Sequence, residues 1–191
     1  MCFAPPMPRT LHLIKHGRPR IVPGVPAHDW ELAEDAVDGL PALARRLQPR
    51  PDLVVSSEEA KARASGQALA AALGVPFRPM LGLHEQLRYT APFRMDPAAF
   101  EADIARFFAH PARVVSGEES ADDTCTRFGN ALNAVMGANG QETVAVVTHG
   151  TVISLVVARA NGLDPLALWR RLGLLDVLTA QWPSLRLEPS P

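Results

Sequence analysis

Residues 142–150 of this 191-residue chain read ETVAVVTHG, an unbroken apolar run that ends at His149-Gly150. A short apolar run of this kind is typical of a strand that is buried on both faces, as in a parallel sheet. The next residues, TVISLVVARANG (151–162), have the length and composition of a helix. A buried strand that runs directly into a helix favours an α/β fold.

The rest of the chain repeats this alternation of strands and helices. Further strands are expected at RTLHLIK (9–15), DLVVSS (52–57) and the short VPFRPM (75–80), with an edge strand or hairpin within residues 174–189. Helical spacing is found at about 32–47, where Gly39 and Pro41 predict a bent or split helix, and at 58–74, 97–110, 120–136 and 164–172. This order predicts an α/β protein with a mainly parallel sheet.

Length and composition indicate one domain over residues 1–191, with a lid or insertion around residues 87–111 that covers one end of the sheet. The chain has 19 basic and 20 acidic residues and no basic run, which argues against a nucleic-acid partner. Its apolar stretches are too short for a membrane span, and prolines interrupt the N-terminal residues where a signal peptide needs an apolar core. The two cysteines, Cys2 and Cys125, form no metal-binding pair, so we expect a soluble, cytoplasmic protein.

Two predicted strands end in the same dipeptide, His16-Gly17 and His149-Gly150. In open parallel sheets, ligands bind beyond the carboxyl ends of the strands, so both histidines are expected to face one crevice. A single histidine at a strand end is more often structural, but the repeated pair favours a site. Glycine after each histidine lets the backbone approach a ligand closely.

Basic residues gather at the same predicted edge. Lys15, Arg18 and Arg20 surround His16, and Lys61 and Arg63 follow the strand that ends at residues 56–57. Taken alone, each of the three arginines fits a solvated surface charge as well as it fits a site. Together with two histidines they predict a site for an anion.

Other kinds of site are not supported. The chain has no GxxxxGK[ST] loop and no GxGxxG turn, the signatures of phosphate and dinucleotide sites. His12 and His16 have a spacing that suits a metal on a helix, but their segment reads as a strand. No GxSxG turn marks a nucleophilic serine, although Ser154 lies close to His149.

Four segments in this order resemble the histidine phosphatase superfamily, which includes the cofactor-dependent phosphoglycerate mutases. They are LIKHGRP (13–19), SSEEAKARASG (56–66), LHEQ (83–86) and VTHGTVIS (147–154). The resemblance implies a phosphoglycerate mutase-like fold, a three-layer sandwich in which helices flank the central sheet.

The resemblance also implies roles for individual residues. His16 matches the nucleophile that takes the phosphoryl group, and His149 matches the second histidine that binds and polarises it. Glu85 matches the acid that protonates the leaving oxygen, with Glu101, Glu118 and Glu119 as alternative acids. The phosphate would be bound by Lys15, Lys61, Arg18, Gly17 and Gly150. Glu119, Ser120 and Arg127 resemble a further segment of the family.

The chain departs from the family at two of these positions. Lys15 and Lys61 stand where the family normally has arginine. A guanidinium group holds a phosphoryl group through two parallel hydrogen bonds, whereas an ammonium group is a compact point charge. The positive charge is therefore kept while the bidentate geometry is lost, and Arg18 is a candidate to supply it.

These residues predict a phosphomonoesterase that hydrolyses a small phosphorylated metabolite through a phosphohistidine, with no metal or other cofactor implied. One alternative is a mutase that returns the phosphoryl group to a phosphoglycerate. Another is a phosphoester-binding protein whose catalysis weakened with the loss of its arginines. The sequence leaves the substrate and the oligomeric state open.

Overall fold

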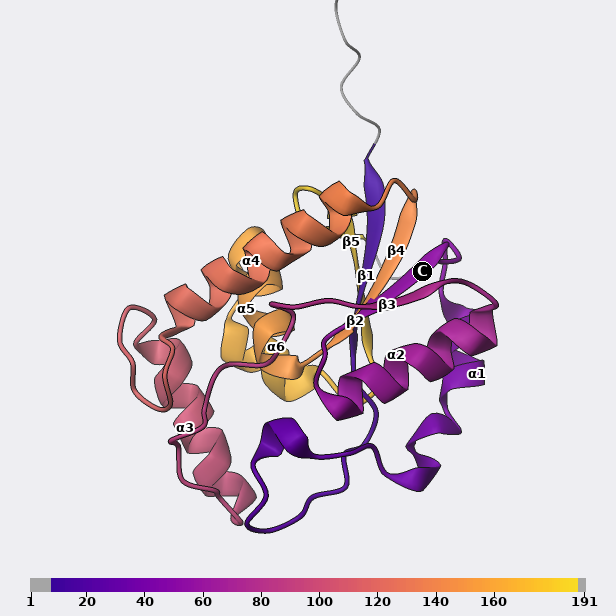
Figure 1. Cartoon of the computed structure of the whole chain (residues 1–191). Helices are drawn as coiled ribbons and strands as arrows, with labels where there is room; N and C mark the ends of the chain where they lie inside the picture. Colours follow the sequence, from indigo (N-terminus) through magenta and orange to yellow (C-terminus); the bar gives the residue numbers. More distant parts are fainter. Residues whose placement is uncertain (1–7, 189–191) are drawn as a thin grey trace, which may run out of the picture.

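The computed structural model describes residues 8–188, so Cys2 and both ends of the predicted domain lie outside the described part. A six-stranded sheet in the order β3-β2-β4-β1-β5-β6 forms its centre (Figure 1). The strands are β1 (Arg9–Lys15), β2 (Leu53–Ser56), β3 (Phe77–Pro79), β4 (Thr143–Thr148), β5 (Val177–Trp182) and β6 (Arg186–Leu187). The helices are α1 (Leu40–Arg46), α2 (Ala60–Leu73), α3 (Pro97–Ala109), α4 (Ala121–Ala138), α5 (Gly150–Asn161) and α6 (Pro165–Arg171).

The sheet is mainly parallel, as the sequence predicts. Strand β4 pairs in parallel with β1 and with β2, and β2 pairs in parallel with β3. Strand β5 runs antiparallel to β1 and forms a short antiparallel pair with β6. The expected C-terminal hairpin is therefore present and closes one edge of the sheet.

Helices cover both faces of the sheet, which confirms the three-layer sandwich. In Figure 1, α1 and α2 lie on one side of the strands and α4, α5 and α6 on the other. Successive strand residues point to opposite layers: Val144 and Val146 pack toward α4 and α5, while Ala145 and Val147 pack toward α1 and α2. A strand buried on both faces needs apolar side chains at every position, which explains the unbroken run in β4.

The register of the three central strands brings their carboxyl ends together. Lys15 is opposite Thr148, and Ser56 is opposite Val147. The next residues, His16, His149 and Ser57, therefore leave the sheet side by side. Backbone hydrogen bonds continue one step further, from the His16 N–H to the Thr148 carbonyl and from the Ser57 N–H to the Val147 carbonyl.

Two less regular segments flank this edge. The helix expected at 32–47 is split into a 3-10 helix, Glu34–Val37, and α1, in agreement with the breaks at Gly39 and Pro41. The predicted lid, 87–111, consists of an irregular stretch followed by α3. Between residues 8 and 188, no helix combines the length and the apolar character that a membrane span needs.

The core of the α4 layer can be tested with two matched substitutions. Leu132 in α4 is fully buried, whereas Leu81 is 78% exposed. Leu132→Ala leaves a cavity and should lower the free energy of unfolding by about 2–5 kcal/mol, while Leu81→Ala should change it by less than about 0.5 kcal/mol. Urea unfolding measures both, and equal effects would contradict this description of the core.

Candidate active site

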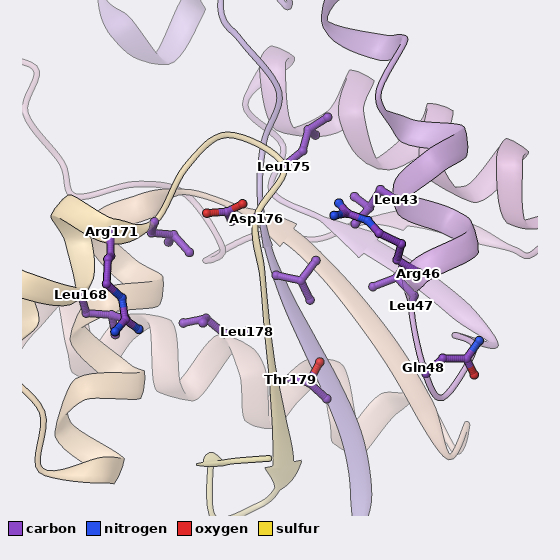
Figure 2. Close-up of a pocket in the computed structure, with 12 residues that line it drawn as sticks. Leu43, Arg46, Leu47, Gln48, Leu168, Arg171, Leu175, Asp176, Leu178 and Thr179 are labelled. Carbon is purple, nitrogen blue, oxygen red and sulfur yellow. The ribbon is translucent and has the colours of Figure 1, made fainter. Parts of the chain in front are cut away.

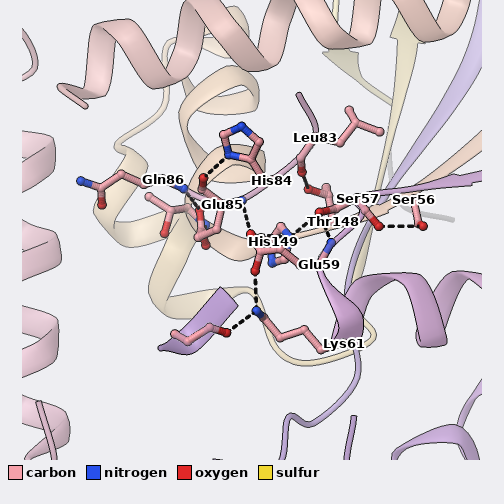
Figure 3. Close-up of polar contacts among 12 residues, drawn as sticks. Ser56, Ser57, Glu59, Lys61, Leu83, His84, Glu85, Gln86, Thr148 and His149 are labelled. Atoms are coloured by element: carbon pink, nitrogen blue, oxygen red, sulfur yellow. Dashed lines mark hydrogen bonds and ion pairs between the residues drawn. The ribbon is translucent and has the colours of Figure 1, made fainter. Parts of the chain in front are cut away.

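A cavity of about 240 Å³ opens at the carboxyl ends of β1, β2 and β4. It is lined by all three predicted catalytic residues, His16, Glu85 and His149. Lys15 and Lys61, the two lysines at positions where arginine was expected, also line it. Figure 3 shows the polar contacts around Glu59, Lys61, Glu85 and His149. The fold thus brings together segments that lie more than 130 residues apart in the sequence.

His16 is held as a neutral imidazole with one nitrogen free. Its Nδ1 lies 2.7 Å from the Gly17 carbonyl oxygen, which can only accept a hydrogen bond, so Nδ1 carries the proton. The Nε2 atom therefore keeps its lone pair. Burial lowers the pKa of His16 from 6.5 to about 4, so the ring is uncharged at neutral pH. A neutral imidazole with a free lone pair can act as a nucleophile.

His149 lies edge-on to His16, with the ring centroids 5.1 Å apart. Its Nε2 atom is 3.0 Å from the Ser57 hydroxyl, while its Nδ1 atom is buried and has no hydrogen-bond partner among residues 8–188. Burial, reinforced by His16, lowers its pKa well below 6.5. If Ser57 donates to Nε2, Nδ1 carries a proton, and an oxygen of a bound anion would provide its missing acceptor.

Glu85 is placed between the second histidine and the start of α5. Its carboxylate accepts the backbone N–H groups of Thr151 and Gln86, at 3.1 and 3.0 Å. Burial would raise its pKa, but attraction to the Arg88 charge, together with these two N–H groups, outweighs burial and lowers the pKa. Glu85 is therefore ionised at neutral pH.

Arg127 fixes the loop that carries Glu85. Its guanidinium group donates to the carbonyl oxygens of Gly82, His84 and Glu85 and forms an ion pair with Glu119. The hydroxyl of Thr148, at the end of β4, also donates to this loop, at the Leu83 carbonyl oxygen 2.6 Å away. The family-like segment around Glu119 and Arg127 thus positions the candidate acid.

The three alternative acids are engaged elsewhere. Glu119 binds Arg127, Glu118 accepts the N–H groups of Tyr89 and Thr90, and Glu101 pairs with Arg170. None of these three carboxylates lines the cavity around the histidines. This placement favours Glu85 as the acid.

Both lysines reach the cavity and are anchored by backbone carbonyl groups. Lys15 Nζ donates to the Leu172 oxygen at 2.8 Å, and Lys61 Nζ donates to the Ala27 oxygen at 2.7 Å. Burial lowers the pKa of Lys15, although Glu85 and Asp176 oppose this effect. Lys61 also forms an ion pair with Glu59. Two ammonium groups therefore flank the histidines.

The remaining predicted binders occupy different surroundings. Arg18 is exposed, pairs with Asp35 and does not line the cavity. Gly17 donates its N–H to the Ser65 hydroxyl, and a side chain at this position would press on the Ala36 carbonyl, 3.1 Å away. Gly150 does line the cavity, and a side chain there would lie 3.3 Å from Lys15. The structure thus brings Gly150 to the site but not the Arg18 side chain.

The structure adds Glu59 to the site, a residue that the sequence analysis did not single out. It lines the cavity and is only 11% exposed. In the sequence it is one of two adjacent glutamates, and its only signal is the spacing of two residues from Lys61. Glutamate in such a position is usually solvated, so the pattern alone could not separate Glu59 from Glu58.

A larger cavity, of about 400 Å³, lies between α1, α6 and β5 (Figure 2). Leucines from these elements form much of its wall, and Arg46, Arg171 and Asp176 are the charged residues there. It contains neither histidine, so the candidate chemistry belongs to the smaller cavity. Within residues 8–188, no cluster of three histidine, cysteine, aspartate or glutamate side chains could hold a metal ion.

Comparison with known proteins agrees with this geometry. A family model described as Histidine phosphatase superfamily (branch 1) matches residues 11–184. The chain belongs to the histidine phosphatase superfamily. No curated protein matches the chain.

Solved structures of other proteins share the fold of this chain. Mycobacterial glucosyl-3-phosphoglycerate phosphatase is 22% identical with a TM-score of 0.68, covering 95% of this chain and 96% of that chain. A mutant phosphoserine phosphatase from Entamoeba histolytica, in complex with phosphoserine, is 16% identical with a TM-score of 0.71, covering 95% of each chain. At these identities the likeness concerns the fold alone.

The neutral state of His16 predicts a pH-dependent contribution to stability. Its pKa is 6.5 in the unfolded chain and about 4 in the folded protein, so between these values the unfolded chain binds more protons. Lowering the pH from 7 to 5 should therefore cost about 2 kcal/mol of folding free energy through this residue. His16→Gln has no such group and should lose less stability over this range.

Urea unfolding of both proteins at pH 7 and pH 5 measures the difference. The carboxylates titrate in both proteins, so their effects cancel in the comparison. A stability difference between wild type and His16→Gln that is the same at both pH values would contradict the buried neutral imidazole.

Proposed function

We propose that this histidine phosphatase superfamily member is a phosphomonoesterase that hydrolyses a small phosphorylated metabolite through a phosphohistidine. The observation that carries the proposal is the free Nε2 lone pair of the buried, neutral His16, which lines a cavity with His149, Glu85 and two ammonium groups. This combination supplies a nucleophile, a source of positive charge and a group for proton transfer.

In the first step, His16 Nε2 attacks the phosphorus atom of the bound ester. The new N–P bond forms as the bond between phosphorus and the leaving oxygen breaks, and Glu85 protonates that oxygen. The carboxyl group must first gain a proton, and the negative charge of the bound phosphoryl group raises its pKa by repulsion. The alcohol then leaves, and His16 carries the phosphoryl group.

In the second step, water attacks the phosphohistidine. The Glu85 carboxylate takes a proton from the water as its oxygen bonds to phosphorus, and the N–P bond breaks. Inorganic phosphate and neutral His16 are the products. Lys15 and Lys61 offset the negative charge on the phosphoryl oxygens in both steps, and His149 Nδ1 donates to one of these oxygens.

The outer part of the cavity suits a leaving group that contains a ring. The chain has one tyrosine and three tryptophans, and the cavity is lined by that tyrosine, Tyr89, and by two tryptophans, Trp30 and Trp169. Phe100 joins them, with its ring centroid 5.9 Å from that of Trp169. Aromatic faces bury planar groups at little entropic cost. We propose that the lid, 87–111, contributes Tyr89 and Phe100 to an aromatic wall that Trp30 and Trp169 complete and that the substrate contacts.

One observation favours a second candidate, a phosphoester-binding protein with weak catalysis. Lys61 stands where the family has arginine, and it is paired with Glu59 rather than free to meet a phosphoryl group. A point charge that is already paired binds an anion less strongly than a free bidentate guanidinium group. Phosphoester binding without turnover would support this alternative.

The nucleophile can be tested against a matched histidine. His16→Ala should reduce hydrolysis of phosphomonoesters by at least about 10³-fold, because the phosphohistidine cannot form. His110, exposed at the end of α3, provides the control, and His110→Ala should retain the wild-type rate.

Release of phosphate from a panel of aryl phosphates, phosphosugars and phosphoglycerates, measured without added metal, is the assay. Equal turnover by wild type and His16→Ala would overturn the proposed mechanism. Activity that requires a bisphosphoglycerate primer would instead indicate a mutase.

The aromatic wall predicts a preference among substrates. Trp169→Ala should lower kcat/KM for phenyl phosphate by about 3- to 10-fold, the effect expected when one aromatic contact is lost. Its effect on methyl phosphate, which has no ring, should be small. Steady-state kinetics on both esters measure the two ratios, and an equal loss for the two would argue against a ring-binding wall.

A further inference from the structure

Glu59 occupies an unusual position for a buried acid. It immediately precedes α2, at the N-cap position, but its side chain makes no capping hydrogen bond. The side chain instead lines the cavity between α2 and the loop that carries Glu85 (Figure 3). A carboxylate that is only 11% exposed needs partners, and its partners here belong to the candidate active site.

Each oxygen of the Glu59 carboxylate meets groups that can donate a hydrogen bond. Its Oε2 lies 2.5 Å from Lys61 Nζ, and its Oε1 accepts the Glu85 N–H at 2.8 Å. The same Oε1 lies 3.4 Å from His149 Nε2. An ammonium group and a backbone N–H are donor types that also hold phosphoryl oxygens in proteins.

The charges around the two neutral histidines also depend on Glu59. Lys15 and Lys61 are the two ammonium groups of the inner cavity, and Glu59 and Glu85 are its two carboxylates. The two pairs cancel, which leaves Arg88, whose guanidinium group stacks on the Phe100 ring, as the remaining positive charge of the lining near Glu85. A phosphate group brings a charge of about −1.5 to −2 at pH 7 and is repelled by both carboxylates.

We propose that Glu59 is a specificity-determining residue that acts as an internal anion and competes with the phosphoryl group for Lys61. The proposal rests on the proposed function in one respect, that the ligand of this cavity is a phosphoryl group. Orthophosphate can bind only in the part of the cavity around the two histidines. Glu59 therefore keeps the affinity of the protein for orthophosphate low. An ester also contacts the aromatic wall and is retained. Glu59 thus selects esters over the free phosphate product.

The test is binding of orthophosphate to the full-length chain, measured by isothermal titration calorimetry. Glu59→Gln keeps the shape of the side chain and an oxygen that can accept the Glu85 N–H, but removes the charge. We expect this variant to bind orthophosphate at least about tenfold more tightly than wild type. Glu58→Gln is the matched control, because Glu58 is the exposed neighbour, and its affinity should equal that of wild type.

A gain in affinity separates this role from a purely structural one, because damage to the site would weaken binding. Glu59→Ala provides a second variant without the charge and should also bind more tightly. Unchanged or weaker binding in both variants, with circular dichroism showing folded protein, would overturn the proposal.

Failure of this proposal can be told apart from failure of the proposed function, because the binding assay needs no turnover. Tighter phosphate binding by Glu59→Gln in a protein that hydrolyses no ester would support Glu59 as an internal anion and overturn the phosphatase. Hydrolysis that depends on His16, with phosphate affinity unchanged by Glu59→Gln, would support the phosphatase and overturn the role of Glu59.

Discussion

The parallel pairing of β1 with β4 is the constraint on which the site depends. With Lys15 opposite Thr148, the two following residues, His16 and His149, must leave the sheet next to each other. A shift of one residue along either strand would reverse the faces of its side chains and disrupt their packing against the helices of both layers. The same apolar packing that stabilises the sheet therefore fixes the distance between the two imidazole rings.

Burial at this edge then determines the chemistry of the groups placed there. Both histidines lose the water that would stabilise their charged forms, so both have lowered pKa values and stay neutral. Glu85 lines the same cavity but is only partly buried, and backbone N–H groups and the nearby Arg88 charge keep it ionised. The two groups line one small cavity, but their different hydrogen-bond partners keep His16 neutral and Glu85 charged.

Lys15 and Lys61 distinguish the proposed phosphate site of this chain from one built on arginine. Lys15 and Lys61 keep the positive charge but bind backbone carbonyl groups, and Lys61 is also paired with Glu59. An ammonium group has three N–H donors, and Lys61 directs two of them to the Ala27 carbonyl oxygen and the Glu59 carboxylate. Lys61 and Glu59, two residues before it, form an ion pair at the candidate site.

Much of this molecule could be predicted from sequence, because local rules are strong where the chain is apolar and regular. The run TVAVVT specified a strand buried on both faces, and the repeated His-Gly after two strands specified a shared edge. Tertiary structure alone separated Glu59 from Glu58, turned Arg18 toward Asp35, and gathered Tyr89, Phe100 and Trp169 around one cavity. These side chains come from separate loops and helices, and their partners are distant in the sequence, so only the packed fold determines what they contact.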